Sequence, residues 1–299
     1  PIAKVLERFR VVQVVGFLNG EVFEPYRNEF DYIKVRSYRE LLKVTGNTVI
    51  YAFKPLVKSF GWSLIKKLMS GNRVVLDIED WEFGMCWENR DLNFIQSWIM
   101  EKFIRFADEV TVVSSFLQKK FGGVILPHGC NTDVFDPELY EKPDNEEKIV
   151  MFAGTPRGHK GLDDLKESLK EVKNARLEIV KGKPHSSMPE TLSCADLVVL
   201  PQRECLATEA QVPGKIFEAM SMAKPIIASN VSDLPEILEG CGLIFEAGNI
   251  NQLAEKIRYL VENEKAVKSL GRKARKKCIK HYSWDAMEKI LASVFNSYK

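Results

Sequence analysis

The sequence lacks the patterns that mark disulfide-stabilised, metal-binding and membrane-spanning proteins. Its six cysteines form no CxxC pair, and with only four histidines they form no cluster at zinc-ligand spacing. This argues for reduced thiols in a cytoplasmic protein. No apolar run approaches the ~20 residues that cross a bilayer. The formal net charge of +2 is too balanced for a protein that binds a nucleic-acid backbone, so no nucleic-acid partner is expected.

The 299 residues are enough for two domains, each with a core of its own. Near-continuous apolar runs alternate with helical patterns along the chain, which is typical of parallel sheets covered on both faces. In the first half, strands are predicted over 11–17, 31–35, 47–53, 73–78, 109–115 and 123–127, and helices over 63–69 and 92–107. In the second half, strands are predicted over 148–154, 175–182, 196–201, 225–229 and 242–247, and two final helices over about 251–280 and 283–298.

This alternation indicates right-handed βαβ units and two Rossmann-like, doubly wound parallel sheets in tandem. The polar segment 127–147, which contains three prolines, is predicted to join the two domains. Ligands of such sheets bind beyond the carboxyl ends of the strands. The candidate site residues are therefore expected at the strand ends.

A basic, glycine-containing segment, GTPRGHKGLDDL, follows the predicted strand 148–154. A helix is expected to begin near Gly161, where free amide groups and the helix dipole favour an anion. Arg157 and Lys160 would add charge-assisted hydrogen bonds to that anion. An ordinary basic surface turn is an equally weighted alternative. The segment has neither the P-loop spacing nor the glycine spacing of a dinucleotide-binding fingerprint.

A second candidate anion site lies in QVPGKIFEAM, residues 211–220. Gly214 would let a phosphate approach the backbone, and Lys215 lies in the first helical turn, where a cation is unfavourable unless an anion binds there. Glu218 lies one turn later and could accept hydrogen bonds from two adjacent hydroxyls, as on a ribose. The alternative is a pair of ordinary helix-surface charges. One diphosphate anchor beside one diol anchor favours a nucleotide-diphosphate ligand.

The segments FAGTPRGHKGLDDL and PGKIFEAMSMAKPIIASNVSDLPEIL resemble the C-terminal domain of the group 1 (family 4) retaining glycosyltransferases. The segment VILPHGCNTDVFDP resembles the linker between the two domains of that family. The resemblance implies an α/β GT-B architecture, with two Rossmann-like domains facing each other across a cleft. It implies an acceptor-side domain over 1–127, joined by the C-terminal helix 283–299, and a donor-binding domain over 128–282.

The resemblance also implies the chemistry. A sugar would pass from a nucleotide-diphosphate donor to a hydroxyl on a glycan or a lipid-linked acceptor, with retention of configuration. No metal and no cofactor are expected beyond the nucleotide-sugar co-substrate. By resemblance, Lys160 matches the donor-phosphate lysine and Glu218 matches the ribose ligand. Lys215 resembles the lysine of a Pro-x-Lys subset, which reaches the diphosphate.

Besides the Pro-x-Lys pattern at Lys215, two departures from the family pattern concern the donor side. Thr155 replaces an arginine that often follows the first glycine, and Arg157 is its candidate substitute. Ala210 occupies the position of the first glutamate in a Glu-x7-Glu motif. Glu209, one position away, is retained as a candidate contact for the sugar or the acceptor.

Acidic residues follow the predicted strand 73–78 in the segment LDIEDWEFG. Glu79 and Asp80 occupy the positions of a His-Asp pair in the family and are the candidate catalytic residues, which would orient or deprotonate the acceptor hydroxyl. Alternatively, Asp77 or Asp80 caps the next segment. A metal site at these acids is not expected, since nothing else supplies ligands. Lys54 is a weaker candidate on the acceptor side.

Residues 54–69 combine basic and aromatic side chains, which would suit contact with a membrane surface, although a crossover helix packed on the sheet is the favoured interpretation. We expect a cytoplasmic protein that could bind peripherally to the inner face of a membrane. The first strand and glycine-rich loop of the family are expected to be missing from this sequence. Two alternative functions stay open, namely a nucleotide-sugar 2-epimerase of the same architecture and a non-catalytic nucleotide-sugar binding protein.

Overall fold

A computed structural model describes residues 1–17, 29–44 and 49–296 of the chain. The chain divides into two compact units. The N-terminal unit comprises Ile2–Pro127, Glu209–Gln211 and Ile290–Lys299, and the C-terminal unit comprises His128–Thr208 and Val212–Lys289, together with Pro1. Residues 47 and 48 of the predicted strand 47–53 and the end of the predicted helix 283–299 lie outside the described residues.

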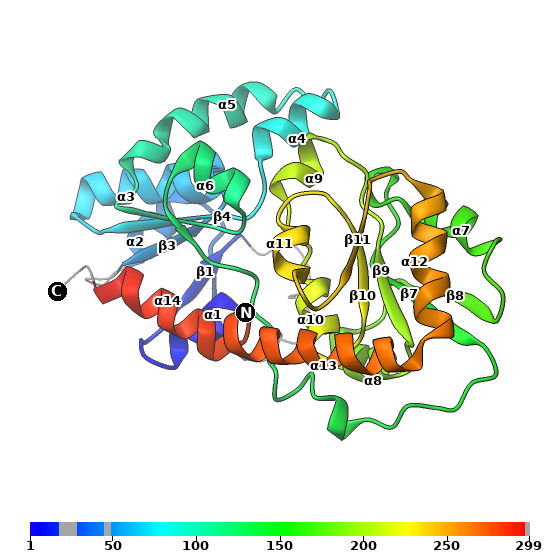
Figure 1. The fold of residues 1–299 in the computed structure, drawn as a ribbon. Helices are drawn as coiled ribbons and strands as arrows, with labels where there is room; N and C mark the ends of the chain where they lie inside the picture. The colour runs from blue at the N-terminus through cyan, green and yellow to red at the C-terminus, as the bar shows by residue number, and fades with distance from the viewer. Residues whose placement is uncertain (18–28, 45–48, 297–299) are drawn as a thin grey trace. The chain divides into compact units, whose positions relative to one another are not determined.

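The N-terminal unit contains a four-stranded parallel sheet in the order β3-β4-β5-β6 and a separate parallel pair, β1-β2. Its strands are β1 (Val14–Gly16), β2 (Tyr32–Lys34), β3 (Ile50–Phe53), β4 (Val74–Ile78), β5 (Glu109–Val112) and β6 (Val124–Ile125). Its helices are α1 (Ile2–Glu7), α2 (Tyr38–Lys43), α3 (Trp62–Ser70), α4 (Glu82–Glu88), α5 (Phe94–Phe103) and α6 (Ser115–Phe121) (Figure 1).

The C-terminal unit contains a five-stranded parallel sheet in the order β11-β10-β9-β7-β8. Its strands are β7 (Lys148–Ala153), β8 (Ala175–Val180), β9 (Leu197–Leu200), β10 (Ile226–Ser229) and β11 (Leu243–Phe245). The helices of this half of the chain are α7 (Leu162–Leu169), α8 (Met188–Ser193), α9 (Leu206–Ala210), α10 (Lys215–Ser221), α11 (Leu234–Leu238), α12 (Ile250–Glu262), α13 (Glu264–His281) and α14 (Trp284–Asn296). The last residues of α9 and α14 belong to the N-terminal unit.

The strands of the C-terminal unit bury side chains on both faces, because helices cover both faces (Figure 1). Met151 and Val198 point into a core with α8, α10, α11 and α13. Their neighbours Val150 and Val199 point into a second core with α7 and α12. Successive side chains of a strand face opposite sides, so continuous apolar runs are needed here. The predicted α/β class with parallel sheets is therefore confirmed, whereas the cleft between the domains stays a prediction.

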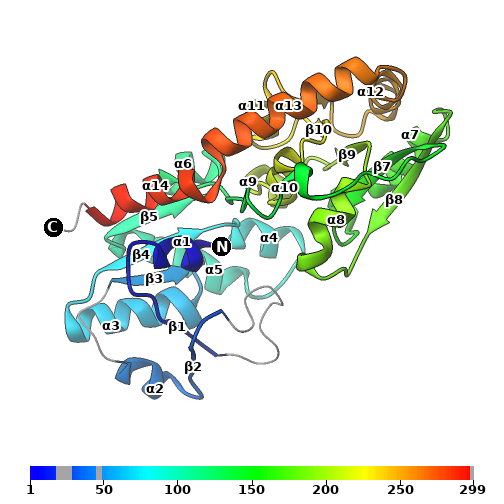
Figure 2. The same ribbon diagram turned by 90° about the horizontal axis from the view of Figure 1, so that it is seen from below.

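Each of the eleven predicted strands is present, with shifts of a few residues at the ends. The single helix predicted over about 251–280 is wrong, because α12 and α13 are separated at Asn263. The Oδ1 atom of Asn263 accepts a hydrogen bond from the Ala266 amide at 3.0 Å. This side chain therefore caps a new helix, and α13 runs at a steep angle to α12 (Figure 2).

The segment 54–69 forms the crossover between β3 and β4, as favoured from the sequence. A π-helical turn over Val57–Gly61 precedes α3, and Phe60 in this turn is fully buried in the core of the N-terminal unit. No helix among residues 1–17, 29–44 and 49–296 is both long and apolar enough to cross a bilayer. All six cysteines are free thiols.

Asp77 is fully buried within β4. Its Oδ1 atom accepts hydrogen bonds from the Thr111 hydroxyl at 2.5 Å and from the Tyr51 hydroxyl at 3.2 Å. In the described part of the chain, its Oδ2 atom has no partner. The alternative that Asp77 caps the next segment is thus wrong. Burial raises the pKa of Asp77 from 3.8 to about 7, and the negative charge of Glu79 adds to this effect, whereas Thr111 and Tyr51 oppose it.

We expect Asp77 to make the stability of the protein depend on pH. Between about pH 4 and about pH 7 the folded protein keeps the proton of Asp77 and the unfolded chain loses it, so the free energy of unfolding falls as the pH rises. The Asp77→Asn variant should remove this dependence and gain stability at pH 8, by up to about 4 kcal/mol. Urea unfolding at pH 4.5, 6 and 8 measures both effects. A variant with the same pH dependence as wild type would contradict this assignment.

Candidate functional site

The loops that follow three neighbouring strands of the C-terminal unit meet at one edge of its sheet. The strands are β7, β9 and β10, which are adjacent and parallel, so their carboxyl ends share that edge. The segment after β7 is a 3₁₀ turn over Gly158–Lys160. Helix α10, which connects β9 to β10, begins at Lys215. Both basic motifs found in the sequence therefore lie at the same edge.

The loop after β7 packs tightly against the loop after β9. Gly161 has a φ of +65°, and a Cβ atom at this position would lie 1.8 Å from the carbonyl oxygen of Pro201. The Arg203 amide donates to the His159 carbonyl at 2.8 Å. The Arg203 guanidinium also binds both oxygens of Asp164, at 2.8 and 2.6 Å. These contacts hold the basic turn against the end of β9.

Lys160 is the central cation of this edge. A Cβ atom built on Gly154, the residue after β7, would lie 3.6 Å from the Lys160 Nζ atom. Partial burial lowers the pKa of Lys160, and the positive charges of Arg157 and Lys215 lower it further. No acidic residue in the described part of the chain forms an ion pair with Arg157 or Lys160. The structure thus brings three of the predicted phosphate ligands close together, and two of them, Arg157 and Lys160, have no acidic partner among the described residues.

Lys215 and Glu218 bind each other on the first turn of α10. The Lys215 Nζ atom donates to both carboxylate oxygens of Glu218, at 3.1 and 2.9 Å. The His185 Nε2 atom lies 3.2 Å from the Glu218 Oε1 atom. This is the arrangement of an ordinary i,i+3 ion pair, joined by a histidine that sequence analysis missed. The roles of Lys215 toward a diphosphate and of Glu218 toward a ribose stay predictions.

Sequence analysis also missed three polar side chains beside β9 and β10. Gln202 follows β9, Ser229 ends β10, and Ser232 lies in the next loop with a φ of +52°. Gln202 is 3% exposed and Ser229 is 0% exposed. Their polar atoms, with the Ser232 hydroxyl, have no hydrogen-bond partner among the residues that the structure describes. Their position at strand ends was the only signal in the sequence, and it did not separate them from ordinary loop residues.

The acceptor-side candidates lie in the N-terminal unit, at the carboxyl ends of β3 and β4. The Lys54 Nζ atom lies 2.6 Å from Asp80 Oδ2 and 2.9 Å from Glu82 Oε1. The Gln211 amide donates to the other oxygen of Asp80 at 3.0 Å. Burial disfavours the charge on Lys54, but Asp80 and Glu82 outweigh it, and the pKa of Lys54 is raised. Asp80 therefore caps no helix, and the structure brings two predicted site residues, Lys54 and Asp80, into contact.

Two further candidates on the acceptor side are Glu79 and Glu209. Glu79 is half-buried at the end of β4, and Glu209 is half-buried on α9. Ala210, at the position of the family glutamate, is fully buried, and its carbonyl accepts a hydrogen bond from the Ser114 hydroxyl at 2.8 Å. The catalytic role of Glu79 and the contact role of Glu209 stay predictions. Across the described ranges, no three His, Cys, Asp or Glu side chains are grouped as ligands of a metal ion.

Comparison with known proteins places this geometry in a family. Residues 133–263 match the family model described as Glycosyl transferases group 1. The match confirms the expected resemblance to the group 1 glycosyltransferases over this part of the chain. The match covers most of the linker and most of the C-terminal unit, including the whole edge that carries Lys160 and Lys215.

Relatives and solved structures agree with this assignment. The chain is 26% identical over 211 residues to the uncharacterized glycosyltransferase MJ1178 of Methanocaldococcus jannaschii, covering 60% of this chain and 56% of that protein. It is 22% identical over 288 residues to the sulfoquinovosyl transferase SQD2 of Arabidopsis thaliana, covering 80% and 54%. The chain thus spans about half the length of these curated relatives.

The structure of Anabaena Alr3699/HepE in complex with UDP and glucose superimposes with a TM-score of 0.81 at 13% identity. The superposition covers 99% of this chain and 95% of that chain. At this identity the likeness shows the fold alone, and it confirms the expected GT-B fold.

The two candidate glycines should respond differently to a methyl group. In Gly161→Ala the new Cβ would collide with the backbone of Pro201, so we expect a loss of at least about 2 kcal/mol of stability. In Gly214→Ala the backbone is already helical and the Cβ would meet only His128 at an ordinary 3.7 Å, so we expect a change within about 0.5 kcal/mol. Thermal unfolding of both variants measures this, and equal destabilisation would contradict the described packing.

Proposed function

We propose that this protein is a retaining, metal-independent glycosyltransferase that moves a sugar from a UDP-sugar to a hydroxyl acceptor. The observation that carries the proposal is the group of three cations, Arg157, Lys160 and Lys215, at one edge of a doubly wound sheet. Arg157 and Lys160 have no acidic partner among the described residues, and the charges of Arg157 and Lys215 disfavour the positive charge on Lys160. A dianionic ligand would remove this penalty. A bound diphosphate is that ligand, and UDP is favoured because a protein of this fold binds it.

The rest of the same edge supplies groups for a nucleotide. On binding, the diphosphate would replace Glu218 as the partner of Lys215, and the released carboxylate would accept hydrogen bonds from the ribose hydroxyls. His185 would keep this carboxylate in place from the side of β8. The unpartnered side chains of Gln202 and Ser229 offer donors and acceptors for the sugar. Each of these groups lies in the C-terminal unit.

The reaction requires that charge be stabilised on the leaving diphosphate. The bond between the sugar C1 atom and the phosphate oxygen breaks, and the acceptor oxygen bonds to C1 on the same face. The leaving phosphate oxygen takes the proton of the acceptor hydroxyl, so no histidine base is required. Three preorganised side-chain cations supply the positive charge that stabilises the leaving group, and electrostatic stabilisation of this kind usually contributes most to catalysis. No cofactor takes part.

In the N-terminal unit, Asp80 and Glu79 would orient the acceptor hydroxyl. Lys54 and Gln211 hold both oxygens of Asp80, so this carboxylate keeps one orientation. We assign Asp80 to positioning of the acceptor on this ground.

We further propose that the acceptor is lipid-linked and that the N-terminal unit binds a membrane surface through α5. This helix and its flanks expose a run of large apolar side chains, which are Leu92 (84%), Ile95 (55%), Trp98 (50%), Ile99 (44%), Phe103 (43%) and Phe106 (47%). The Lys102 ammonium lies 5.4 Å from the Trp98 ring, and the Arg105 guanidinium lies 5.0 Å from the Phe106 ring. Exposed aromatic and basic groups together suit the interface of an anionic membrane. The free thiols suit its cytoplasmic face.

Isothermal titration with UDP tests the donor site. Each of Lys160→Met and Lys215→Met should weaken UDP binding at least about tenfold, because a charge-assisted hydrogen bond contributes about 1.5–3 kcal/mol. Binding of uridine, which has no phosphate, should change little. Lys170→Met is the matched control, since Lys170 is an exposed lysine of the same unit in an i,i+3 pair. UDP affinities equal to that of the control would refute the proposed diphosphate site.

Proton NMR of a reaction with UDP-sugars tests the chemistry. A retaining transferase should release UDP slowly, and the first-formed free or transferred sugar should keep the anomeric configuration of the donor. The Glu218→Gln variant should lose most of this turnover. UDP binding without turnover across the UDP-sugar panel would indicate the non-catalytic alternative. A donor converted to its 2-epimer would indicate the isomerase.

Vesicle co-sedimentation tests the membrane surface. The Trp98→Gln/Ile99→Gln variant should bind vesicles of anionic phospholipid several-fold more weakly than wild type, and neutral vesicles should bind both weakly. Tyr259→Gln, which replaces a 49% exposed residue of the C-terminal unit, is the control. If the α5 variant binds as the control does, this face of α5 is not the membrane surface.

A further inference from the structure

A second cationic pocket lies at the opposite edge of the sheet of the C-terminal unit. It lies where β7, β9 and β10 begin, and its volume is about 240 Å³. The donor edge lies where these strands end. The four residues of β9 alone separate the two edges by about 13 Å. The pocket is thus distinct from the proposed donor site, and the inference below does not rest on the proposed function.

The floor of the pocket is apolar. Leu197 and Pro225 line it from the starts of β9 and β10, while Leu260, Val261 and Val267 line it from the junction of α12 and α13. The break in the helix at Asn263 forms this wall, because an unbroken helix would not turn across the strand starts. An apolar floor favours a ligand with a carbon skeleton over a bare inorganic ion.

Charged side chains surround this floor. Four lysines (Lys142, Lys148, Lys224 and Lys268) and two acids (Asp196 and Glu264) line the pocket, so its formal charge is four positive minus two negative, or +2. Lys268 pairs with Glu264 at 2.6 Å. The other four charged groups then sum to +2, which an anion with two negative charges would balance.

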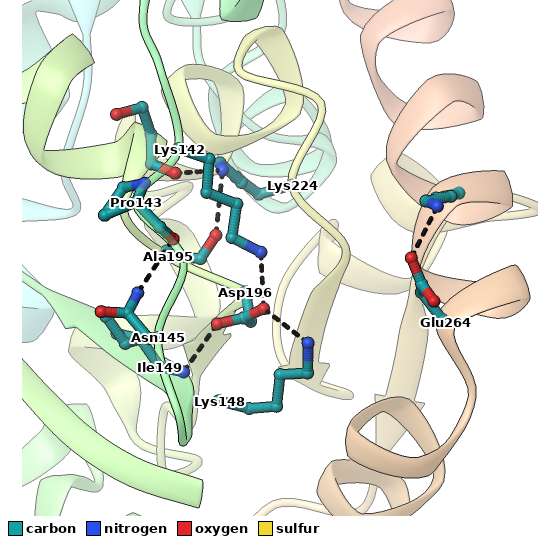
Figure 3. Close-up of polar contacts among 11 residues, drawn as sticks. Lys142, Pro143, Asn145, Lys148, Ile149, Ala195, Asp196, Lys224 and Glu264 are labelled. Atoms are coloured by element: carbon teal, nitrogen blue, oxygen red, sulfur yellow. Dashed lines mark hydrogen bonds and ion pairs between the residues drawn. The ribbon is translucent and has the colours of Figure 1, made fainter.

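Asp196 holds two of the lysines at the pocket. Its Oδ1 atom lies 2.5 Å from the Lys142 Nζ atom and 3.5 Å from the Lys148 Nζ atom. Its Oδ2 atom accepts a hydrogen bond from the Ile149 amide at 2.8 Å. Figure 3 shows both ammonium groups converging on this carboxylate, that of Lys142 from the segment before β7 and that of Lys148 from the first residue of β7. The carboxylate is therefore saturated, and it positions Lys142 and Lys148 rather than leaving a free negative charge.

Lys224 is the buried cation of the pocket. It is 9% exposed, and its Nζ atom donates to the carbonyls of Ser193 at 2.7 Å and Ala195 at 2.9 Å (Figure 3). An ammonium group has three donors, so one is available beyond these two bonds. Burial and, to a lesser extent, the charge of Lys142 lower the pKa of Lys224 to about 8, although Asp196 opposes this. A ligand anion at this place would restore the ordinary value.

We propose that this pocket binds a small phosphomonoester, whose phosphate group is held by Lys142, Lys148 and Lys224 and whose carbon skeleton lies on the apolar floor. A phosphate dianion balances the formal charge of +2, and its three terminal oxygens can accept from three ammonium groups. A carboxylate would leave one positive charge unbalanced.

The test uses phenyl phosphate as the probe and isothermal titration of the whole chain. Wild type should bind one equivalent, more tightly than it binds inorganic phosphate. The Lys142→Gln/Lys148→Gln variant, which changes two lysines exposed at the rim, should lose at least about tenfold in affinity. Lys166→Gln/Lys170→Gln, which removes two exposed lysines elsewhere in the same unit, is the charge-matched control and should bind as wild type does.

Two further measurements distinguish binding in this pocket from binding at the donor edge. Saturating UDP should not displace the probe, and Lys160→Met should bind it with unchanged affinity. Lysine side-chain NMR should show the pKa of Lys224 rising when phenyl phosphate binds, with Lys224→Met identifying the resonance. The proposal would be overturned by any of four results: displacement of phenyl phosphate by UDP, loss of its binding in Lys160→Met, unchanged binding in the Lys142→Gln/Lys148→Gln variant, or no binding to wild type. Equal affinity for inorganic phosphate would overturn the role of the floor.

Discussion

The candidate donor site depends on the close contact between the loops after β7 and β9. The Pro201 carbonyl occupies the space where Gly161 would carry a side chain, and Arg203 fastens both loops through His159 and Asp164. Without this contact, Lys160 would be an ordinary exposed lysine on a surface turn. With it, the ammonium group is partly buried beside two other cations, which lowers its pKa and makes an anion favourable there.

The two edges of the C-terminal sheet use positive charge in different ways. At the carboxyl edge, Lys160 has cations as neighbours and no acidic partner in the described residues, so a bound anion must supply the compensation. At the amino edge, Asp196 binds both Lys142 and Lys148 but balances only one of their charges, and the buried Lys224 adds a second excess charge. The first arrangement suits a diphosphate that leaves after reaction. The second suits a ligand that stays bound on an apolar floor.

In the N-terminal unit, the charged acids that follow β4 are held by ion pairs. Lys54 forms ion pairs with both Asp80 and Glu82, and Gln211, 131 residues further along the chain, donates a hydrogen bond to Asp80. Asp77, two positions before Glu79, is fully buried instead, and burial raises its pKa to about 7, so it retains its proton below that pH. The acids that follow each other in the sequence therefore have different environments: Asp77 lies in the core, whereas Asp80 and Glu82 form ion pairs with Lys54.

The sequence by itself determined the strands, their parallel order within βαβ units and the basic motifs at the strand ends, because these follow from short-range patterns of apolar and glycine residues. Only the tertiary structure decided which of these residues meet. The contact of Gly161 with Pro201, the shell of Asp80 and the burial of Gln202 and Lys224 join residues far apart in the chain. Such contacts depend on how crossover segments pack, and packing leaves no periodic signal in a single sequence.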